Sequence, residues 1–159
     1  DAKLENLVVP IKIDISTGDV ITPGEVRYDY PLLLEDKSIQ LWSYNLETIL
    51  AEKIQTILSR GLLNTRMRDF YDVTTLFNRY KDLINYNDLS LAFDRTCRKR
   101  ETLSLLEHYE EILSSISEDS ILQNLWKNYC RKYKYASHIK FSTNIEILKH
   151  LMNQILAIE

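Results

Sequence analysis

The sequence predicts an α+β protein in which short N-terminal β-strands are followed by a helical bundle. Apolar and polar residues alternate near the N-terminus, as in a half-buried strand, whereas beyond residue 45 apolar residues recur at helical spacing. Only three glycines and three prolines occur among the 159 residues, and this scarcity of turn formers favours helices over an all-β sandwich. We therefore expect a β-strand segment at residues 1–45 and a helical bundle at residues 46–159.

Three strands are expected in the first segment. Residues 8–16 alternate, with Ile11 and Ile13 on one face and Lys12 and Asp14 on the other. Glycine and proline mark turns near residues 18 and 23, and the further strand candidates are residues 25–34 and 38–44. So few strands are rarely stable alone in water, and we expect them to pair with more sheet, in another segment or in a partner.

Six helices are expected in the second segment. Asn45 is a good N-cap for the first, and Gly61 is a plausible stop. The pattern places the second at residues 65–80, the third from a cap at residue 87 or 88 to about 100, the fourth at 102–114, the fifth from 119 or 120 to about 134, and the last at 145–158 after a Ser142-Thr143 cap.

Composition narrows the classes of function. The formal net charge of −3 gives no overall field that attracts nucleic acid, so any such binding must come from a local patch. Cys97 and Cys130 lack metal-ligand spacing and are typical of reduced thiols in a cytoplasmic protein. No apolar run approaches the ~20 residues of a membrane span. The scattered histidines and isolated glycines indicate neither a hydrolase triad nor a phosphate-binding loop.

Lys53 falls within the apolar face of the first predicted helix. That face holds Leu46, Ile49, Leu50, Ile54 and Ile57. Burying an ammonium group is unfavourable unless it meets an anion, and Asp69 lies in the apolar face of the next helix. The pair is consistent with a phosphate-binding lysine oriented by a carboxylate, or with a structural ion pair or a lysine that extends its head to the solvent. From periodicity alone the structural roles are the commoner ones.

Two more aspartates near these patterns have alternative roles. Asp72 lies at the margin of its helix face and four residues after Arg68, so an Arg68–Asp72 ion pair within the helix is expected. Asp14 projects from the polar face of the first predicted strand, a suitable place for a carboxylate that holds Mg²⁺ against a phosphate. An isolated carboxylate of this kind is more often a solvated surface residue.

A basic and aromatic run at residues 126–140 predicts a local RNA-binding patch. Tryptophan and tyrosines alternate there with five cations, Lys127, Arg131, Lys132, Lys134 and Lys140. Cations suit phosphates and aromatic rings suit unpaired bases, so single-stranded or folded RNA is the matching ligand. The alternative is a solvated helix face with tyrosines at its rim.

Residues 46–76 together resemble one protein family. An Ala-Glu-Lys helix (residues 51–53), a short loop and an Arg-Asp-x-x-Asp helix (residues 68–72) are similar to the second half of the AbiEii-type nucleotidyltransferases. These are toxins of bacterial abortive-infection and type IV toxin–antitoxin systems. The segments at residues 12–19 and 92–102 are similar to the same family, so the resemblance covers most of the chain.

The resemblance implies a DNA polymerase β-like nucleotidyltransferase fold that uses NTP and Mg²⁺ and transfers a nucleotide to an acceptor such as tRNA, with an antitoxin protein as a further partner. By position, Lys53 matches the lysine that holds the triphosphate, with Arg68 beside it in the nucleotide site. Asp69 matches a late essential aspartate, with Asp72 as the alternative. Asp14 is the candidate carboxylate near the metal.

The sequence lacks the family's first motif, a Gly-rich turn followed by a Ser/Asp-x-Asp strand that supplies the main metal ligands. We therefore expect the C-terminal part of such an enzyme, inactive by itself, because metal-assisted transfer needs those carboxylates. The alternatives are a non-catalytic helical module that binds RNA or an antitoxin, and a gene remnant with no present function.

Overall fold

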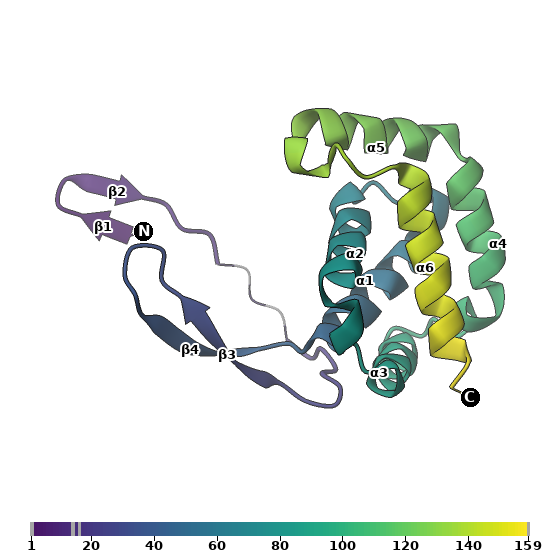
Figure 1. The fold of residues 1–159 in the computed structure, drawn as a ribbon, viewed down its shortest axis with the longest axis horizontal. Helices are drawn as coiled ribbons and strands as arrows, with labels where there is room; N and C mark the ends of the chain where they lie inside the picture. The colour runs from purple at the N-terminus through teal and green to yellow at the C-terminus, as the bar shows by residue number, and fades with distance from the viewer. Residues whose placement is uncertain (1, 14, 16, 159) are drawn as a thin grey trace.

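Two β-hairpins precede six α-helices in the computed structural model, which describes residues 2–13, 15 and 17–158 (Figure 1). The strands are β1 (Ala2–Leu4), β2 (Leu7–Val9), β3 (Val26–Pro31) and β4 (Ser38–Ser43). The helices are α1 (Leu46–Arg60), α2 (Met67–Tyr80), α3 (Tyr86–Lys99), α4 (Leu105–Glu118), α5 (Ser120–Lys132) and α6 (Phe141–Leu156), with short 3-10 helices η1 (Gly61–Leu63), η2 (Lys81–Leu83) and η3 (Lys134–Ala136). The α+β class and the order of strands before helices are confirmed.

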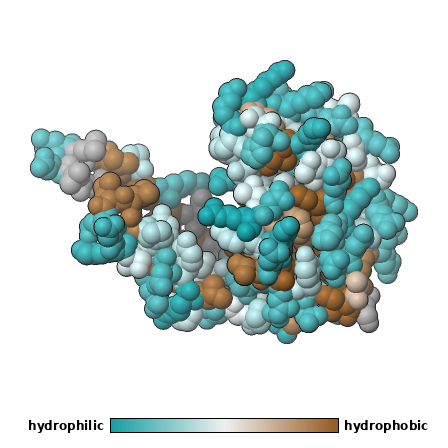
Figure 2. Space-filling model, viewed as in Figure 1, coloured by the Kyte–Doolittle hydropathy of each residue, from teal (hydrophilic) through white to brown (hydrophobic). Residues whose placement is uncertain are grey.

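The hairpins extend away from the bundle (Figure 1), and the apolar side chains of β3 and β4 lie on the surface (Figure 2). Strands β3 and β4 are antiparallel, and Tyr28 lies opposite Leu41 while Tyr30 lies opposite Ile39. These four side chains share one face of the two-stranded sheet, because side chains alternate between faces along a strand. All four are exposed. The hairpin therefore has an apolar face that the described residues do not cover.

The first strand prediction was wrong in extent. Only Leu7–Val9 is a strand, paired with β1, and residues 10–13 and 15 belong to no strand. Ile11 and Ile13 are 58% and 78% exposed. Alternation produces a strand only where a neighbouring strand accepts its hydrogen bonds, and no such neighbour lies beside residues 10–13 within the described chain. Asp14 lies outside the described residues.

Asn45 joins the strand segment to the bundle. Its Oδ1 accepts a hydrogen bond from the N–H of Thr48 at 2.7 Å, so it caps α1 as predicted. Its Nδ2 donates to the carbonyl oxygens of Thr22 and Gly24, both at 2.8 Å. The N–H of Thr22 in turn donates to Oγ1 of Thr48 at 2.9 Å. One amide side chain thus fixes both the start of the helix and the path of the chain leading into β3.

Other helix ends agree with the predictions in part. Asp119 caps α5, accepting the N–H of Leu122 at 2.7 Å, as expected. The cap of α3 is Asn85 rather than residue 87 or 88. Glu47 accepts the backbone N–H of Asn85 at 2.9 Å, and this contact from α1 fixes where α3 begins. Helix α4 runs from 105 to 118 rather than from 102 to 114, and α6 begins at Phe141, before the expected Ser142-Thr143 cap.

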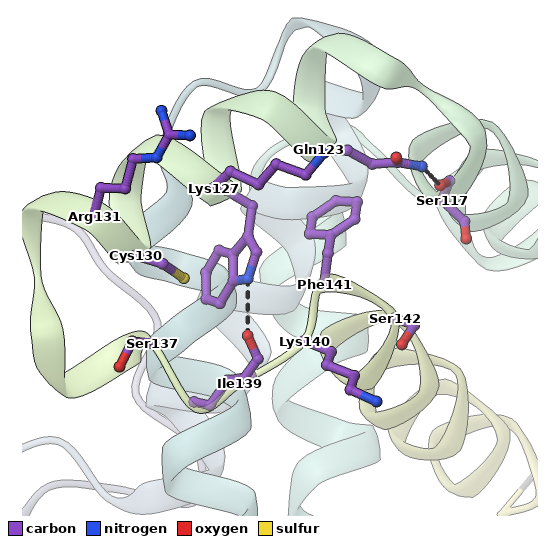
Figure 3. A pocket seen from close by; sticks show the side chains of 11 residues that line it. Ser117, Gln123, Lys127, Cys130, Arg131, Ser137, Ile139, Lys140, Phe141 and Ser142 are labelled. Carbon is purple, nitrogen blue, oxygen red and sulfur yellow. Dashed lines mark hydrogen bonds between the residues drawn. The ribbon is translucent and has the colours of Figure 1, made fainter.

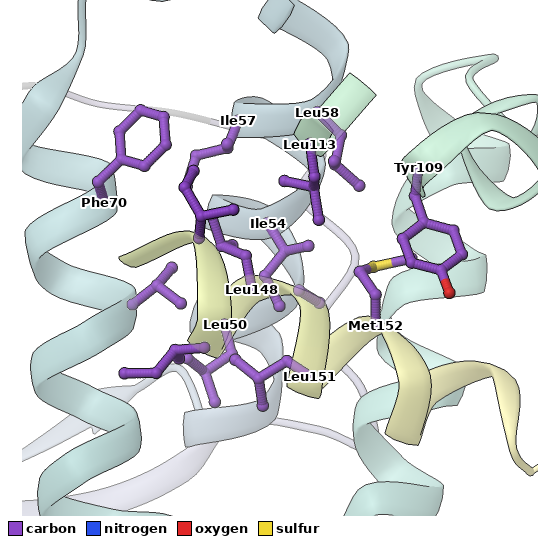
Figure 4. Packing of buried hydrophobic residues seen from close by; sticks show 14 of the residues in the cluster. Leu50, Ile54, Ile57, Leu58, Phe70, Tyr109, Leu113, Leu148, Leu151 and Met152 are labelled. Carbon is purple, nitrogen blue, oxygen red and sulfur yellow. The ribbon is translucent and has the colours of Figure 1, made fainter. Parts of the chain in front are cut away.

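The core lies among α1, α2, α3, α4 and α6, where α2, α3 and α4 pack on α1 and α6 packs on those three helices (Figure 4). Its fully buried members include Leu50, Ile54, Phe70, Leu113 and Leu148, from four different helices. Burial of this many apolar side chains is the main stabilising contribution in a bundle of this size. Both cysteines are free. None of the helices in the described part of the chain is long and apolar enough to cross a membrane.

Candidate functional site

Lys53 of α1 lies between two carboxylates of α2. Its Nζ donates to Oδ1 of Asp69 at 3.1 Å and to Oδ2 of Asp72 at 2.7 Å. Residues three apart on a helix share a face, so α2 presents both carboxylates to the same neighbour. The three side chains are only 13–24% exposed. The structure therefore brings together all three residues that the sequence singled out for catalysis.

The position of Lys53 on its helix differs from the prediction in one respect. The centre of the buried face of α1 is formed by Leu50, Ala51, Ile54, Ile57 and Leu58. Ile49 and Lys53 lie at the edge of that face and are half-buried. The ammonium group is thus held at the boundary between core and solvent, where a ligand can reach it.

Two arginines add positive charge beside the carboxylates. The Nε of Arg66 lies 3.8 Å from Oδ2 of Asp69, and the Nε of Arg68 lies 3.8 Å from Oδ2 of Asp72. The predicted Arg68–Asp72 pair is therefore present, although Lys53 makes the shorter contact with Asp72. Three cations face two anions here. The surplus positive charge favours a further anion.

A pocket of about 300 Å³ opens beside Lys53. Its lining residues are Tyr44, Ile49, Glu52, Lys53, Thr56, Arg66, Asp69 and Arg100. A smaller pocket of about 170 Å³ shares Glu52 and Arg100 with it and reaches Asp19 and Lys99. Basic groups from α1, from the residue before α2 and from the end of α3 thus converge on one hollow.

Arg100, like Arg66, is a site residue that sequence reasoning did not assign to the Lys53 pocket. Its guanidinium donates to Oε1 of Gln55 and to Oγ1 of Thr56, at 3.2 Å for the latter, and lies 3.5 Å from Glu52. These contacts hold its charge at the pocket wall. In the sequence, Arg100 stands in the segment 92–102 that resembles the family and in a basic cluster at residues 95–100, which was a candidate extension of the RNA-binding patch.

Two acidic groups in these pockets have raised pKa values. Burial raises the pKa of Glu52, and the nearby Arg100 partly opposes this shift. The hydroxyl of Tyr44 donates to Asp19 at 2.8 Å, and this bond is the main cause of the raised pKa of Tyr44. Both effects follow from placing ionisable groups next to carboxylates or away from water.

Comparison with known protein families shows to which family the chain belongs. Residues 2–146 match the model of the nucleotidyl transferase AbiEii toxin of type IV toxin–antitoxin systems. The chain belongs to the AbiEii nucleotidyl transferase toxin family. No curated protein and no solved structure was found to match it. The predicted resemblance is confirmed, and the matched region includes the hairpins, the Lys53 pocket and the start of α6.

Nucleotidyl transferases in general act on NTP with a divalent metal. The described residues of this AbiEii chain suit the binding of NTP better than the binding of a metal ion. The cations around the Lys53 pocket suit a triphosphate. Within the described residues, no group of three or more histidine, cysteine or acidic side chains could hold a metal ion. Asp69 and Asp72 are already bonded to Lys53. These residues therefore do not by themselves form a Mg²⁺ site, and the Asp14 prediction is not tested.

The predicted RNA-binding residues of this AbiEii chain divide into two groups. Lys127 and Arg131 of α5 line a third pocket, of about 640 Å³, with Lys140 from the segment before α6 (Figure 3). Lys132 and Lys134 are exposed but do not line it, and the Nζ of Lys132 lies 5.2 Å from the ring centroid of Tyr133. Their roles in RNA binding stay predictions.

Tyrosines connect this third pocket to the Lys53 site. Tyr129 stacks on Trp126 with ring centroids 5.5 Å apart, and its hydroxyl lies 3.2 Å from that of Tyr135. The ring of Tyr135 lies 4.9 Å from that of Tyr71, the neighbour of Asp72 in the sequence. Burial and the contact with Tyr135 raise the pKa of Tyr129. The aromatic part of the predicted patch therefore reaches α2.

Proposed function

We propose that the Lys53 pocket binds the triphosphate of an NTP and forms part of the active site of a nucleotidyltransferase toxin with a DNA polymerase β-like fold. The acceptor of the nucleotide is an RNA, with tRNA the first candidate. Family membership supports the general activity. The observation that carries the role of this pocket is the surplus of positive charge around Lys53, with Arg66 and Arg100 on the same wall.

The geometry of Lys53 suits it to hold a phosphate oxygen. A lysine ammonium has three N–H donors, and Asp69 and Asp72 accept two of them. No other described residue accepts the third, which is left for a ligand in the pocket. The carboxylates fix the direction of the side chain, so less conformational entropy is lost when the ligand binds. In this proposal Lys53 contacts the nucleotide, and Asp69 and Asp72 are positioning residues.

In the transfer step, a hydroxyl oxygen of the acceptor forms a bond to the α-phosphorus of the NTP while the bond from that phosphorus to the β-phosphate oxygen breaks. Pyrophosphate leaves, and the acceptor proton passes to a base or to solvent. Negative charge builds up on the leaving group, and a cation held beside it lowers the barrier. Lys53 and Arg100 are the groups we assign to that charge.

Replacing Lys53 by alanine in the complete toxin should abolish toxicity, because the triphosphate loses its fixed cation. The melting temperature should change little, since Asp69 and Asp72 keep Arg66 and Arg68 as neighbours. Growth arrest in expressing cells and thermal unfolding of the purified protein are the two measurements. Lys149→Ala, at an exposed lysine of α6, is the matched control. A fully toxic Lys53→Ala variant would show that the lysine is structural.

We further propose that the 159-residue chain does not transfer nucleotides by itself, because its sequence has no Gly-rich turn with a Ser/Asp-x-Asp strand. Incubation with radiolabelled NTPs, Mg²⁺ and tRNA should give no labelled RNA. Robust labelling would overturn this expectation and would show that the carboxylates needed for metal-assisted transfer are present in the chain.

A second candidate function is a binding module for RNA or for the antitoxin of a type IV system. The pocket that contains Lys127 and Arg131 favours it, because this pocket is basic and separate from Lys53. On this hypothesis tRNA binds the chain in a salt-dependent manner, and reversing the charges of Arg131 and Lys132 removes the binding while Lys53→Ala does not.

A further inference from the structure

The pocket between α5 and the start of α6 differs in charge from the Lys53 site. Lys127, Arg131 and Lys140 are among its lining residues (Figure 3), and none of the lining residues is acidic. No ion pair is seen for these three cations within the part of the chain that the structure describes. At the Lys53 site, by contrast, each cation has a carboxylate beside it. Three unneutralised cations around one hollow select an anion.

Aromatic residues also line this pocket. Trp126 is buried, and its Nε1 donates to the carbonyl oxygen of Ile139 at 3.1 Å. The ring of Phe141 lies 6.3 Å from that of Trp126 and is half-buried, so part of its surface is open to the pocket. Tyr129 stacks on Trp126 from another side. A planar apolar group that enters the pocket would meet ring surface that is already fixed in place.

The first turn of α6 adds hydrogen-bond donors at the same place. No side chain caps this helix, so its first backbone N–H groups lack a side-chain partner. The hydroxyl-bearing Ser142 lies in this turn and lines the pocket. Donors of this type strengthen binding of a phosphate that the cations have attracted.

We propose that this pocket binds one nucleotide of a single-stranded RNA, with the base against Phe141, which packs on Trp126, and the phosphates at Lys127, Arg131 and Lys140. A volume of about 640 Å³ is within the range of small-ligand sites. This inference rests on the proposed function, since it gives the RNA acceptor a holding point apart from the reacting end. The tyrosines that lead from Trp126 to Tyr71 mark the path towards Lys53.

The chain offers its own reporter for the test. Trp126 and Trp42 are its two tryptophans, and Trp42 lies on the distant β4 strand. In a Trp42→Phe background all tryptophan fluorescence comes from the pocket wall. Titration of this 159-residue variant with a single-stranded oligo(A) RNA at low salt should change that fluorescence, and anisotropy of a fluorescently labelled RNA measures the same affinity independently.

Charge reversal separates the pocket from general electrostatic attraction. Arg131→Glu and Lys140→Glu should each weaken RNA binding about tenfold and reduce its salt dependence. Lys149→Glu makes the same charge change on the exposed side of α6 away from the pocket and should have little effect. Lys53→Ala should bind RNA as the unsubstituted chain does. Loss of NTP binding and loss of RNA binding can therefore be told apart by the variant that causes each. Circular dichroism confirms that each variant is folded.

Three results would overturn the proposal. One is an equal loss of affinity in Lys149→Glu and in the pocket variants. Another is equal affinity for duplex RNA or for poly-glutamate, because a duplex presents no unstacked base and the peptide has only charge in common with RNA. The third is the absence of any RNA binding by the folded chain.

Discussion

The helical bundle and the β3–β4 hairpin of this chain contain similar apolar side chains but use them differently. In the bundle, Phe93 and Leu148 have no exposed surface. In the hairpin, Tyr28 and Leu41 are 51% and 45% exposed although they lie opposite each other in register. Backbone pairing and exposed side-chain contacts, such as that of Arg27 with Trp42, hold the hairpin together, whereas side-chain burial holds the bundle together. The stability of the chain should therefore come from the bundle.

The largest expected effect is a difference in the free energy of unfolding between a core variant and a hairpin variant. Phe93→Ala should lower the free energy of unfolding by about 3–5 kcal/mol, because it leaves a cavity in the core. Leu41→Ala should change it by less than about 0.5 kcal/mol, as for other surface substitutions. Urea unfolding followed by circular dichroism measures both. A comparable loss in Leu41→Ala would mean that the hairpin face is covered in solution.

A smaller effect is expected at the junction of the two regions. Asn45→Ala removes the cap of α1 and both bonds to the chain before β3, so we expect a loss of about 2 kcal/mol. Asn45→Ser keeps a side-chain acceptor for the cap but loses both bonds to the carbonyl oxygens, and it should cost about half as much. Proteolysis within residues 25–37 should increase in both variants, because both release the tether.

If proteolysis increases only in Asn45→Ala, the cap alone positions the hairpin, and the two bonds to Thr22 and Gly24 contribute nothing to the contact between the regions. Ser43→Ala, one position before Tyr44 and outside the cap, is the control.

The smallest effect concerns Glu52 and pH. Burial raises the pKa of this carboxyl above its ordinary value of 4.5, so the folded state holds the proton more tightly than the unfolded chain does. Its contribution to stability is fully present below pH 4.5 and is lost as the pH rises through the folded-state pKa. Glu52→Gln cannot ionise, so its stability relative to the wild type should increase across that range.

Urea unfolding at a series of pH values measures this difference. Glu146→Gln, at an exposed position of α6, is the control and should show no such trend. A difference between Glu52→Gln and wild type that does not vary with pH would contradict the prediction. It would mean that the ion pair with Arg100 offsets the burial of the carboxylate.

Much of the bundle could be predicted because helical periodicity and capping residues are local signals. The ends that were misplaced depend on tertiary contacts, as at Asn85, whose backbone N–H is bound by Glu47 from another helix. The strand expected at residues 8–16 failed for the same reason, since a strand needs a neighbour that the alternation of residues cannot specify. The division into segments 1–45 and 46–159 stays a prediction.

In the candidate site, the contact between Lys53 and Asp69 could be predicted, because each residue places a charge within the apolar face of its helix and the two charges are opposite. Arg100 could not be placed in the same pocket, because it lies on α3's C-terminal end and no short-range pattern relates it to α1. The basic run at residues 126–140 indicated Lys127, Arg131 and Lys140 but not Phe141. Phe141 joins these residues at the pocket because the chain turns back after η3 to start α6.

The two cysteines differ in burial, so the alkylation rates of their thiols report on two different motions of the molecule. Cys97 is fully buried in the last turns of α3, and burial raises the pKa of its thiol. Since the thiolate is the reactive form, an alkylating reagent can modify Cys97 only when the bundle opens. Cys130 is half-buried and lines the pocket between α5 and α6. The alkylation rate of Cys97 thus measures how often the bundle opens, and the alkylation rate of Cys130 measures how accessible the pocket is.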